Sequence, residues 1–224
     1  MQNLSPASIM MNKTAKLKKL AQDRGLPEEI LGKFKKGLIP ECLRNKAIDY
    51  VTSFKRTEGK GMLIYGDVGA GKTYFMAYLL FLFLDRAVYL QENEDPYYET
   101  EHGLVVRKDY FYDFDFFWAD SRLILECYHD YESDNRQKIF KKKVLLWDEF
   151  DVEKRTDWEF KALDDVLLHR YNAGLTTIIT TNLSIKDLRE MREEPKYRRM
   201  MDRLLDQDRF IRILVRGGTK RRIR

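Results

Sequence analysis

Short apolar runs alternate along the chain with stretches in which apolar residues recur every three or four positions. Five runs predict buried strands, at residues 62–65, 87–90, 144–147, 176–181 and 210–215. Helical spacing predicts helices from Pro40, from Lys72 to about Leu84, from Phe116 to Tyr131 and from Thr156 to Gly174. Strands that alternate with helices indicate an α/β fold, in which a parallel sheet is covered by helices on both faces.

The two ends of the chain differ from this central pattern. Residues 1–38 are polar and weakly helical, with a helix start at Pro27 and a stop at Gly37. We therefore expect a short helical N-terminal extension over 1–38, a core over 39–216 and a basic tail over 217–224. Residues 91–112 are hard to place: the polar start, with its proline, is expected to form a loop or hairpin tip, and residues 104–114 can return as a strand.

The composition predicts a globular protein with a large polar surface. Of 224 residues, 44% are hydrophobic, enough for one sizeable core, and 34% are charged. No signal peptide is apparent, and the longest apolar run, from Ala77 to Leu84, is too short to span a bilayer. Cys42 and Cys127 suit neither a disulfide framework nor a zinc site, and both are expected to be buried thiols. A cytoplasmic protein without membrane contact is predicted.

Charge is distributed unevenly along the chain. Residues 1–60 carry 13 Lys and Arg against 6 Asp and Glu, and residues 203–224 carry 8 against 2. The stretch between them carries 20 against 28. Basic ends favour contact with nucleic acid phosphates, although solvated surfaces and a fraying tail are the simpler interpretation.

The clearest motif lies between the strand at 62–65 and the helix from Lys72. It matches the phosphate-binding pattern G-x-x-x-x-G-K-[ST], the Walker A motif of P-loop proteins, at every position. Its glycines let backbone N–H groups face an anion, the lysine reaches the β- and γ-phosphates, and the threonine binds Mg²⁺. The motif predicts an ATP site made of Gly66, Asp67, Val68, Gly69, Ala70, Gly71, Lys72 and Thr73.

Two further strand ends carry polar residues suited to ATP hydrolysis. The apolar run 144–147 ends in Asp148 and Glu149, the form of a Walker B motif. We expect Asp148 to hold Mg²⁺ and Glu149 to act as general base for the attacking water. The strand at 176–181 ends at Asn182, which is expected to contact the attacking water or the γ-phosphate. The alternatives are a helix cap for the carboxylates and a turn for the asparagine.

These motifs, in this order, resemble those of the AAA+ ATPases, and within them the DnaC/DnaI/IstB group of helicase loaders and transposition helpers. The resemblance covers about residues 40–216 and depends most on GDVGAGKT, VLLWDEF, TTIITTNLS and RMMDRLLD. It implies an AAA+ core that hydrolyses ATP with Mg²⁺. Because only 42 residues follow Asn182, the chain is similar to the members that have no C-terminal lid domain.

The resemblance also implies ATP sites at subunit interfaces of a ring or spiral. In this group an arginine of the R-x-M-D-R segment is an arginine finger, which completes the ATP site of the neighbouring subunit. The matching residue is Arg203, with Arg199 or Arg198 as alternatives, and surface ion pairs are the other interpretation. For a second, nucleotide-sensing arginine the tail offers Lys220, Arg221 or Arg222, and none is preferred.

Three functions fit this resemblance. The first is a helicase loader for DNA replication, with a hexameric replicative helicase and single-stranded DNA as partners. The second is an IstB-like transposition helper acting on duplex DNA, and the third is a nucleotide switch that binds a protein. Residues 1–38 are a candidate helicase-docking segment, and residues 107–112 combine basic and aromatic side chains suited to base stacking.

Overall fold

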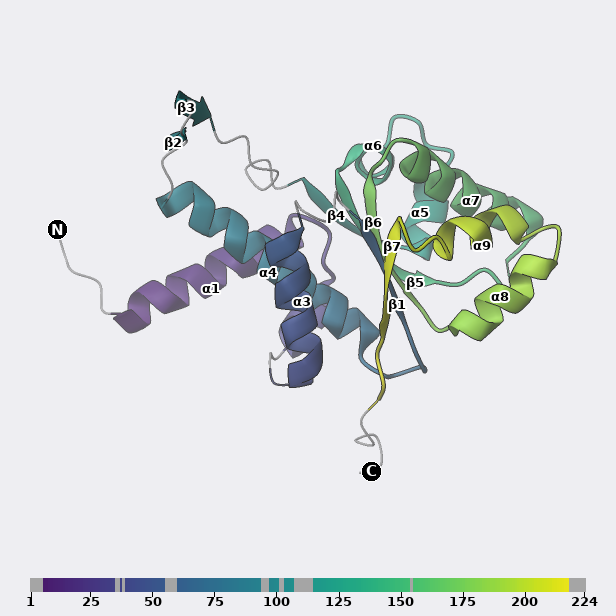
Figure 1. Cartoon of the computed structure of the whole chain (residues 1–224), viewed down its shortest axis with the longest axis horizontal. Coiled ribbons are helices and arrows are strands. Elements are labelled where there is room, and N and C mark those ends of the chain that lie inside the picture. The colour runs from purple at the N-terminus through teal and green to yellow at the C-terminus, as the bar shows by residue number, and fades with distance from the viewer. Residues whose placement is uncertain are drawn as a thin grey trace.

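The computed structural model describes residues 6–34, 37, 39–54, 60–93, 97–100, 103–106, 115–153 and 155–217. Its centre is a parallel sheet of five strands in the order β4-β5-β6-β1-β7 (Figure 1). The strands are β1 (Gly61–Tyr65), β4 (Phe116–Asp120), β5 (Val144–Phe150), β6 (Thr176–Thr181) and β7 (Phe210–Leu214). The expected α/β fold with a parallel sheet is confirmed.

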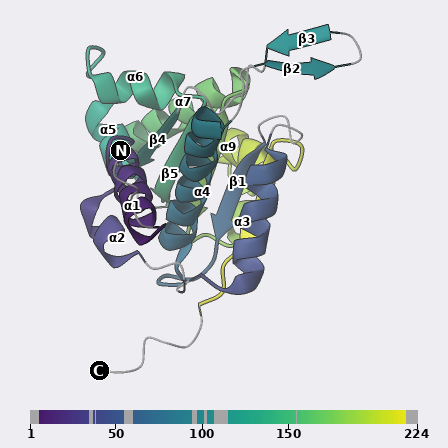
Figure 2. The ribbon, with the colours of Figure 1, turned by 90° about the vertical axis from the view of Figure 1, so that its left-hand side faces the viewer.

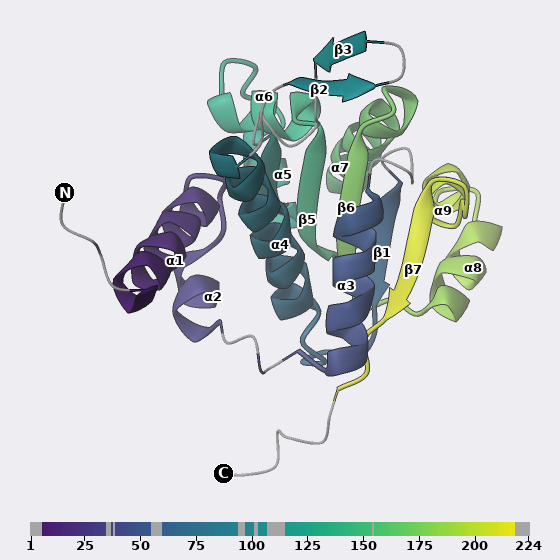
Figure 3. The same cartoon turned by 60° about the vertical axis from the view of Figure 1, so that its left-hand side comes forward.

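Helices cover both faces of the sheet, as Figure 3 shows. One face carries α1 (Pro6–Gln22), α2 (Glu28–Lys33), α3 (Glu41–Ser53) and α4 (Lys72–Asn93). The other carries α5 (Ser121–Cys127), α6 (Asp134–Lys141), α7 (Asp157–Asn172), α8 (Ile185–Glu193) and α9 (Arg198–Leu204). Among the described residues, the chain after β6 holds α8, α9 and β7, and no helical bundle follows β7.

Successive residues of each strand enter opposite cores. Met62 and Ile64 of β1 pack with α3 and α4, whereas Leu63 packs on the α7 side. Since both faces are buried, the strands need no polar alternation, and this is why they appear in the sequence as continuous apolar runs. The largest buried side chains include Trp118 and Trp147, one on each face.

Two predicted elements are wrong. Residues 87–90 are not a strand, because α4 continues without a break to Asn93. Residues Phe116–Asp120 are not helical, because they form the edge strand β4, and the helix begins only at Ser121. The Asp120 carboxylate accepts a hydrogen bond from the Leu123 backbone N–H and caps α5, which fixes this boundary.

Residues after α4 form a separate two-stranded antiparallel hairpin. It consists of β2 (Tyr97–Thr100) and β3 (Gly103–Val106), and Figure 2 shows it apart from the main sheet. The expected hairpin and returning strand are therefore present. Residues 107–112, suggested above as a DNA contact, lie outside the described residues, as do Lys220, Arg221 and Arg222.

The N-terminal helices pack on the core, and the turn that joins them covers an edge of the sheet. Ala21, Leu26 and Leu31 are buried in the same core as α4. The Arg24 carbonyl accepts a hydrogen bond of 2.7 Å from the backbone N–H of Trp118 on β4. The turn thus satisfies part of the outer edge of β4, an edge that would otherwise be open to pairing with another chain.

The two cysteines, both predicted to be buried, differ in exposure. Cys127 is buried as expected, but Cys42 is exposed, because it lies near the start of α3 on the side away from the core. Within the described part of the chain, no helix is long and apolar enough to cross a membrane.

Candidate nucleotide-binding site

The phosphate-binding loop connects β1 to α4 at the carboxyl end of the sheet. Its three glycines have positive φ angles, 146° at Gly66, 77° at Gly69 and 97° at Gly71, a region that side chains with a Cβ rarely adopt. Gly66 has a second constraint, because a Cβ there would lie 2.1 Å from the Val215 carbonyl oxygen. The glycine spacing in the motif is therefore required by backbone conformation and by the strand beside it.

Lys72 is the buried cation of the site. Its ammonium donates hydrogen bonds to the carbonyls of Gly66 and Asp67, both at 2.8 Å, and to Asn182 Oδ1 at 2.7 Å. Burial lowers the pKa of this ammonium, while the carboxylates of Asp148, Asp67 and Glu149 oppose that shift. The structure thus brings Lys72 and Asn182, 110 residues apart, into direct contact at the ends of neighbouring strands.

Asp148 and Thr73, the two predicted Mg²⁺ ligands, lie in direct contact. The Thr73 hydroxyl donates a hydrogen bond of 3.1 Å to Asp148 Oδ1, and the Asp148 side chain is buried. Burial raises the pKa of Asp148 to about 6, although hydrogen bonds from Thr180 and Thr73 favour the ionised form. One carboxylate and one hydroxyl in contact suit Mg²⁺, which binds through few protein oxygens and keeps its remaining sites for water and phosphate.

Glu149 has an unusual backbone conformation at the end of β5. Its φ angle is 54°, and among the described residues it is the only one other than glycine with a positive value. The pairing of β5 with β6 shifts register between Trp147 and Phe150, at the same place. Two hydroxyls hold the backbone of Glu149 on both sides of its Cα. Thr180 Oγ1 accepts a hydrogen bond from the Glu149 N–H at 2.9 Å, and the Ser121 hydroxyl donates to the Glu149 carbonyl at 2.9 Å.

Lys72, Thr73 and Asn182 line one cavity of about 700 Å³, which is within the usual range for small-molecule sites. Glu149 is exposed and lines it together with the phosphate loop. Other lining residues were not predicted from the sequence as site residues: Gly37, Pro40, Tyr74, Thr180, Thr181, Arg216 and Gly217. Tyr74 directly follows the motif on α4, so its position signals a role, but Pro40 and Arg216 reach the cavity only through the tertiary fold.

Arg203 lies elsewhere, on α9. Its Nη1 donates to Asp164 Oδ1 of α7 at 2.8 Å, and the side chain is mostly buried. The alternatives Arg198 and Arg199, on the same helix, are exposed. None of the three lines the cavity of its own chain. A role for this helix in hydrolysis therefore requires the site of another subunit.

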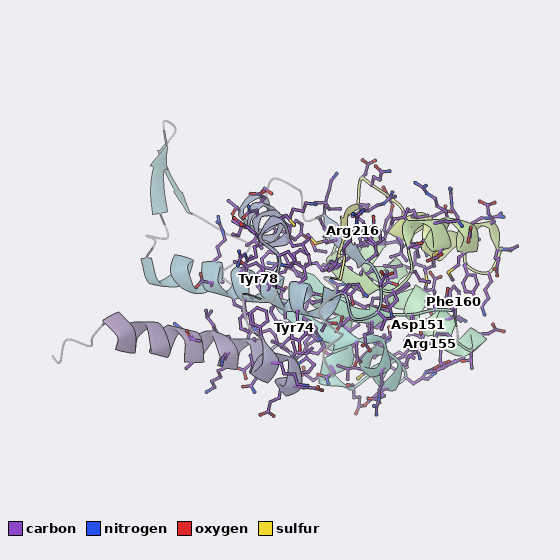
Figure 4. All side chains as sticks on the ribbon, turned by 90° about the horizontal axis from the view of Figure 1, so that it is seen from below. Tyr74, Tyr78, Asp151, Arg155, Phe160 and Arg216 are labelled. Carbon is purple, nitrogen blue, oxygen red and sulfur yellow. The ribbon has the colours of Figure 1, made fainter. Side chains whose placement is uncertain are left out.

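Figure 4 labels residues around the two ends of this region. Tyr74 and Tyr78 lie on α4 and Arg216 follows β7, whereas Asp151 and Arg155 lie on the β5–α7 connection and Phe160 lies near the start of α7. Arg155 Nε donates to the Asp151 carbonyl at 3.1 Å and so closes this connection on itself. The connection begins directly after Glu149 and Phe150, so it links α7 to the strand that carries the carboxylates.

Comparisons with known proteins agree with this geometry. No family profile matches the chain. The crystal structure of DnaI superposes with a TM-score of 0.57 at 19% identity, covering 87% of this chain and 94% of that one. The crystal structure of the DnaC helicase loader superposes with a TM-score of 0.53 at 20% identity, covering 77% and 87%. This chain has the AAA+ fold of the DnaC and DnaI helicase loaders.

Two further proteins are similar to this chain, one in structure and one in sequence. A putative primosome component from Streptococcus pyogenes serotype M3 superposes with a TM-score of 0.54 at 18% identity, over 88% of this chain and 93% of that one. In sequence, the chain is 24% identical over 216 residues to the replicative helicase loader DnaI of Bacillus subtilis. That match covers 89% of this chain and 62% of the relative, so the chain spans less than two thirds of the curated protein's length.

Proposed function

We propose that this protein is an ATPase that hydrolyses ATP to ADP and phosphate with Mg²⁺. The observation that carries the proposal is the convergence of Lys72, Thr73, Glu149 and Asn182 on one cavity, from α4, β5 and the end of β6. Asp148 lies beside them, in hydrogen-bond contact with Thr73. Elements far apart in the sequence have no structural need to place two carboxylates, a lysine and an amide together. Phosphoryl transfer requires this combination of groups.

Each residue has a separate task in this proposal. The loop N–H groups and Lys72 bind the phosphates, and Thr73 and Asp148 hold Mg²⁺, which neutralises charge on the phosphate oxygens. Glu149 accepts the proton of the attacking water, because it is the exposed carboxylate that lines the cavity. Asn182 donates through its amide to the water or the γ-phosphate, while its carbonyl oxygen holds Lys72.

Turnover in this proposal depends on assembly into a ring or spiral. Arg203 is proposed as the arginine finger, supplied to the ATP site of the next subunit, because it cannot reach its own cavity from α9. Charge supplied in trans of this kind accelerates phosphoryl transfer by about 10³ to 10⁵-fold in other systems. The ion pair with Asp164 holds the arginine between α9 and α7 before assembly.

At the level of the cell, we propose a helicase loader in DNA replication, with a hexameric replicative helicase and single-stranded DNA as partners. The similarity to the loader DnaI of Bacillus subtilis over most of this chain supports this choice. The test is the light-scattering mass of this protein mixed with the replicative helicase of its own source, with and without ATP. A complex larger than the helicase hexamer supports loading, and two unchanged masses contradict it.

The second candidate is a transposition helper acting on duplex DNA, since the IstB branch shares the same motifs. The light-scattering experiment distinguishes it when repeated with DNA in place of the helicase. ATP-dependent coating of duplex DNA without a helicase complex favours the helper. A nucleotide switch, the third candidate, predicts slow hydrolysis that neither form of DNA accelerates.

A further inference from the structure

The Thr180 hydroxyl joins both carboxylate residues of the site. Thr180 lies on β6 and its side chain is fully buried. Its Oγ1 donates to Asp148 Oδ1 at 2.5 Å and accepts the backbone N–H of Glu149 at 2.9 Å. The same Asp148 oxygen accepts the Thr73 hydroxyl, so one carboxylate atom is held from both β6 and α4.

The number of protons that Thr180 and the Glu149 N–H can donate fixes the direction of these hydrogen bonds. A hydroxyl has one proton, and the Glu149 N–H can only donate, so Thr180 must direct its own proton to Asp148. This arrangement keeps Asp148 oriented towards Thr73. It also holds the Glu149 peptide at its φ angle of 54°, a conformation that persists only when surrounding groups enforce it.

We propose that Thr180 is a positioning residue for ATP hydrolysis, which sets the orientation of the metal-binding carboxylate and the general base together. The inference rests on the proposed ATPase function. It assigns Thr180 no contact with the reacting atoms, and its effect is transmitted through Asp148 and Glu149. Loss of the hydroxyl therefore lowers kcat more than it weakens nucleotide binding, because the phosphate loop is unaffected.

The test compares three variants of the full chain in ATP turnover and ATP affinity. Thr180→Val keeps the shape but removes the hydroxyl, and kcat is expected to fall about 10- to 100-fold, as for other supporting hydrogen bonds around a metal. The Kd for ATP should change less than about threefold, the bound expected when the phosphate contacts are kept. Thr180→Ser restores the hydroxyl and should return kcat to near the wild-type value.

The matched control is Thr177→Val, on the same strand. Thr177 is also buried, and its hydroxyl accepts a hydrogen bond from Arg170 far from the carboxylates. This variant should lose stability without loss of kcat. Wild-type kcat in Thr180→Val, failure of serine to rescue, or an equal fall in Thr177→Val would each overturn the inference. Absence of turnover in the wild-type protein would instead contradict the proposed function.

Discussion

At the residue scale, the fold depends on a buried arginine as much as on its apolar core. Arg170 of α7 has no exposed surface. It donates to the carbonyls of Ile139 at 2.8 Å, Lys142 at 2.9 Å and Thr176 at 2.6 Å. The first two are at the carboxyl end of α6, where the helix dipole favours a cation. Burial lowers the pKa of Arg170 to about 9, so the side chain remains charged at neutral pH.

Arg170→Met is expected to destabilise the protein by about 3 kcal/mol, because it leaves several buried carbonyls without a donor. The measurement is the free energy of unfolding in urea. Arg189→Met, on the exposed surface of α8, is the control and should change this energy by less than about 0.5 kcal/mol. Similar stability of the two variants would contradict the role assigned to Arg170.

Site residues that belong to a contiguous sequence motif could be predicted from the sequence alone. The loop from Gly66 to Thr73, the carboxylate pair and Asn182 lie at strand ends that apolar runs already indicate, and the structure brings them together. Thr180 could not be predicted in this way. Its role depends on the pairing of β5 with β6 and on contacts that no local spacing encodes.

At the element scale, the same distinction explains the two errors. The strands β1, β5, β6 and β7 were predicted correctly because each is an isolated apolar run between polar segments. The strand β4 was mistaken for part of a helix because its aromatic run is followed at once by α5, and only Asp120 marks the boundary. The run at 87–90 was mistaken for a strand because it continues the apolar sequence of α4, which is buried against the sheet and α3 as far as Ala87.

The turn between α1 and α2 gives a test at this scale. Gly25 has a φ angle of 89°, and a Cβ there would lie 2.6 Å from the Trp118 carbonyl oxygen. Gly25→Ala should therefore destabilise the protein by about 2 kcal/mol through backbone strain and displacement of the turn from β4. The loss would appear as a lower midpoint of thermal or urea unfolding.

Gly32→Ala supplies the matched control for this prediction. Gly32 lies within α2, where a Cβ would meet no atom within 4 Å. Alanine there should leave stability unchanged or raise it by up to about 1 kcal/mol, because alanine favours a helix. If Gly25→Ala were as stable as Gly32→Ala, the turn would not be essential to the edge of the sheet.

At the scale of the whole molecule, the proposed hydrolysis requires more than one subunit. The cavity holds the groups for binding and proton transfer, whereas Arg203 lies on α9, paired with Asp164. Arg203→Ala should lower hydrolysis on the order of 10³-fold under conditions of assembly, without a change in ATP affinity. Measurements below and above the concentration of self-association separate this effect from any loss within a single subunit.

Mixing two inactive variants gives a sharper form of the same experiment. Lys72→Ala keeps the arginine but cannot bind the phosphates, and Arg203→Ala keeps the phosphate site but lacks the arginine. A mixture should recover part of the activity if the arginine acts in trans. No recovery, or an equal loss in dilute Arg203→Ala, would contradict the proposed role, and Arg199→Ala would then be tested in the same way.

The central claim is that this cavity hydrolyses ATP, and the most direct measurement is Mg²⁺-dependent phosphate release by the wild-type protein and by Glu149→Gln. We expect turnover by the wild type, and loss of turnover with retained ATP binding in Glu149→Gln, because an amide cannot accept the proton. Lys72→Ala, measured beside it, should lose binding as well. Turnover that survives in Glu149→Gln would place the general base elsewhere, and ATP affinity retained in Lys72→Ala would contradict the site itself.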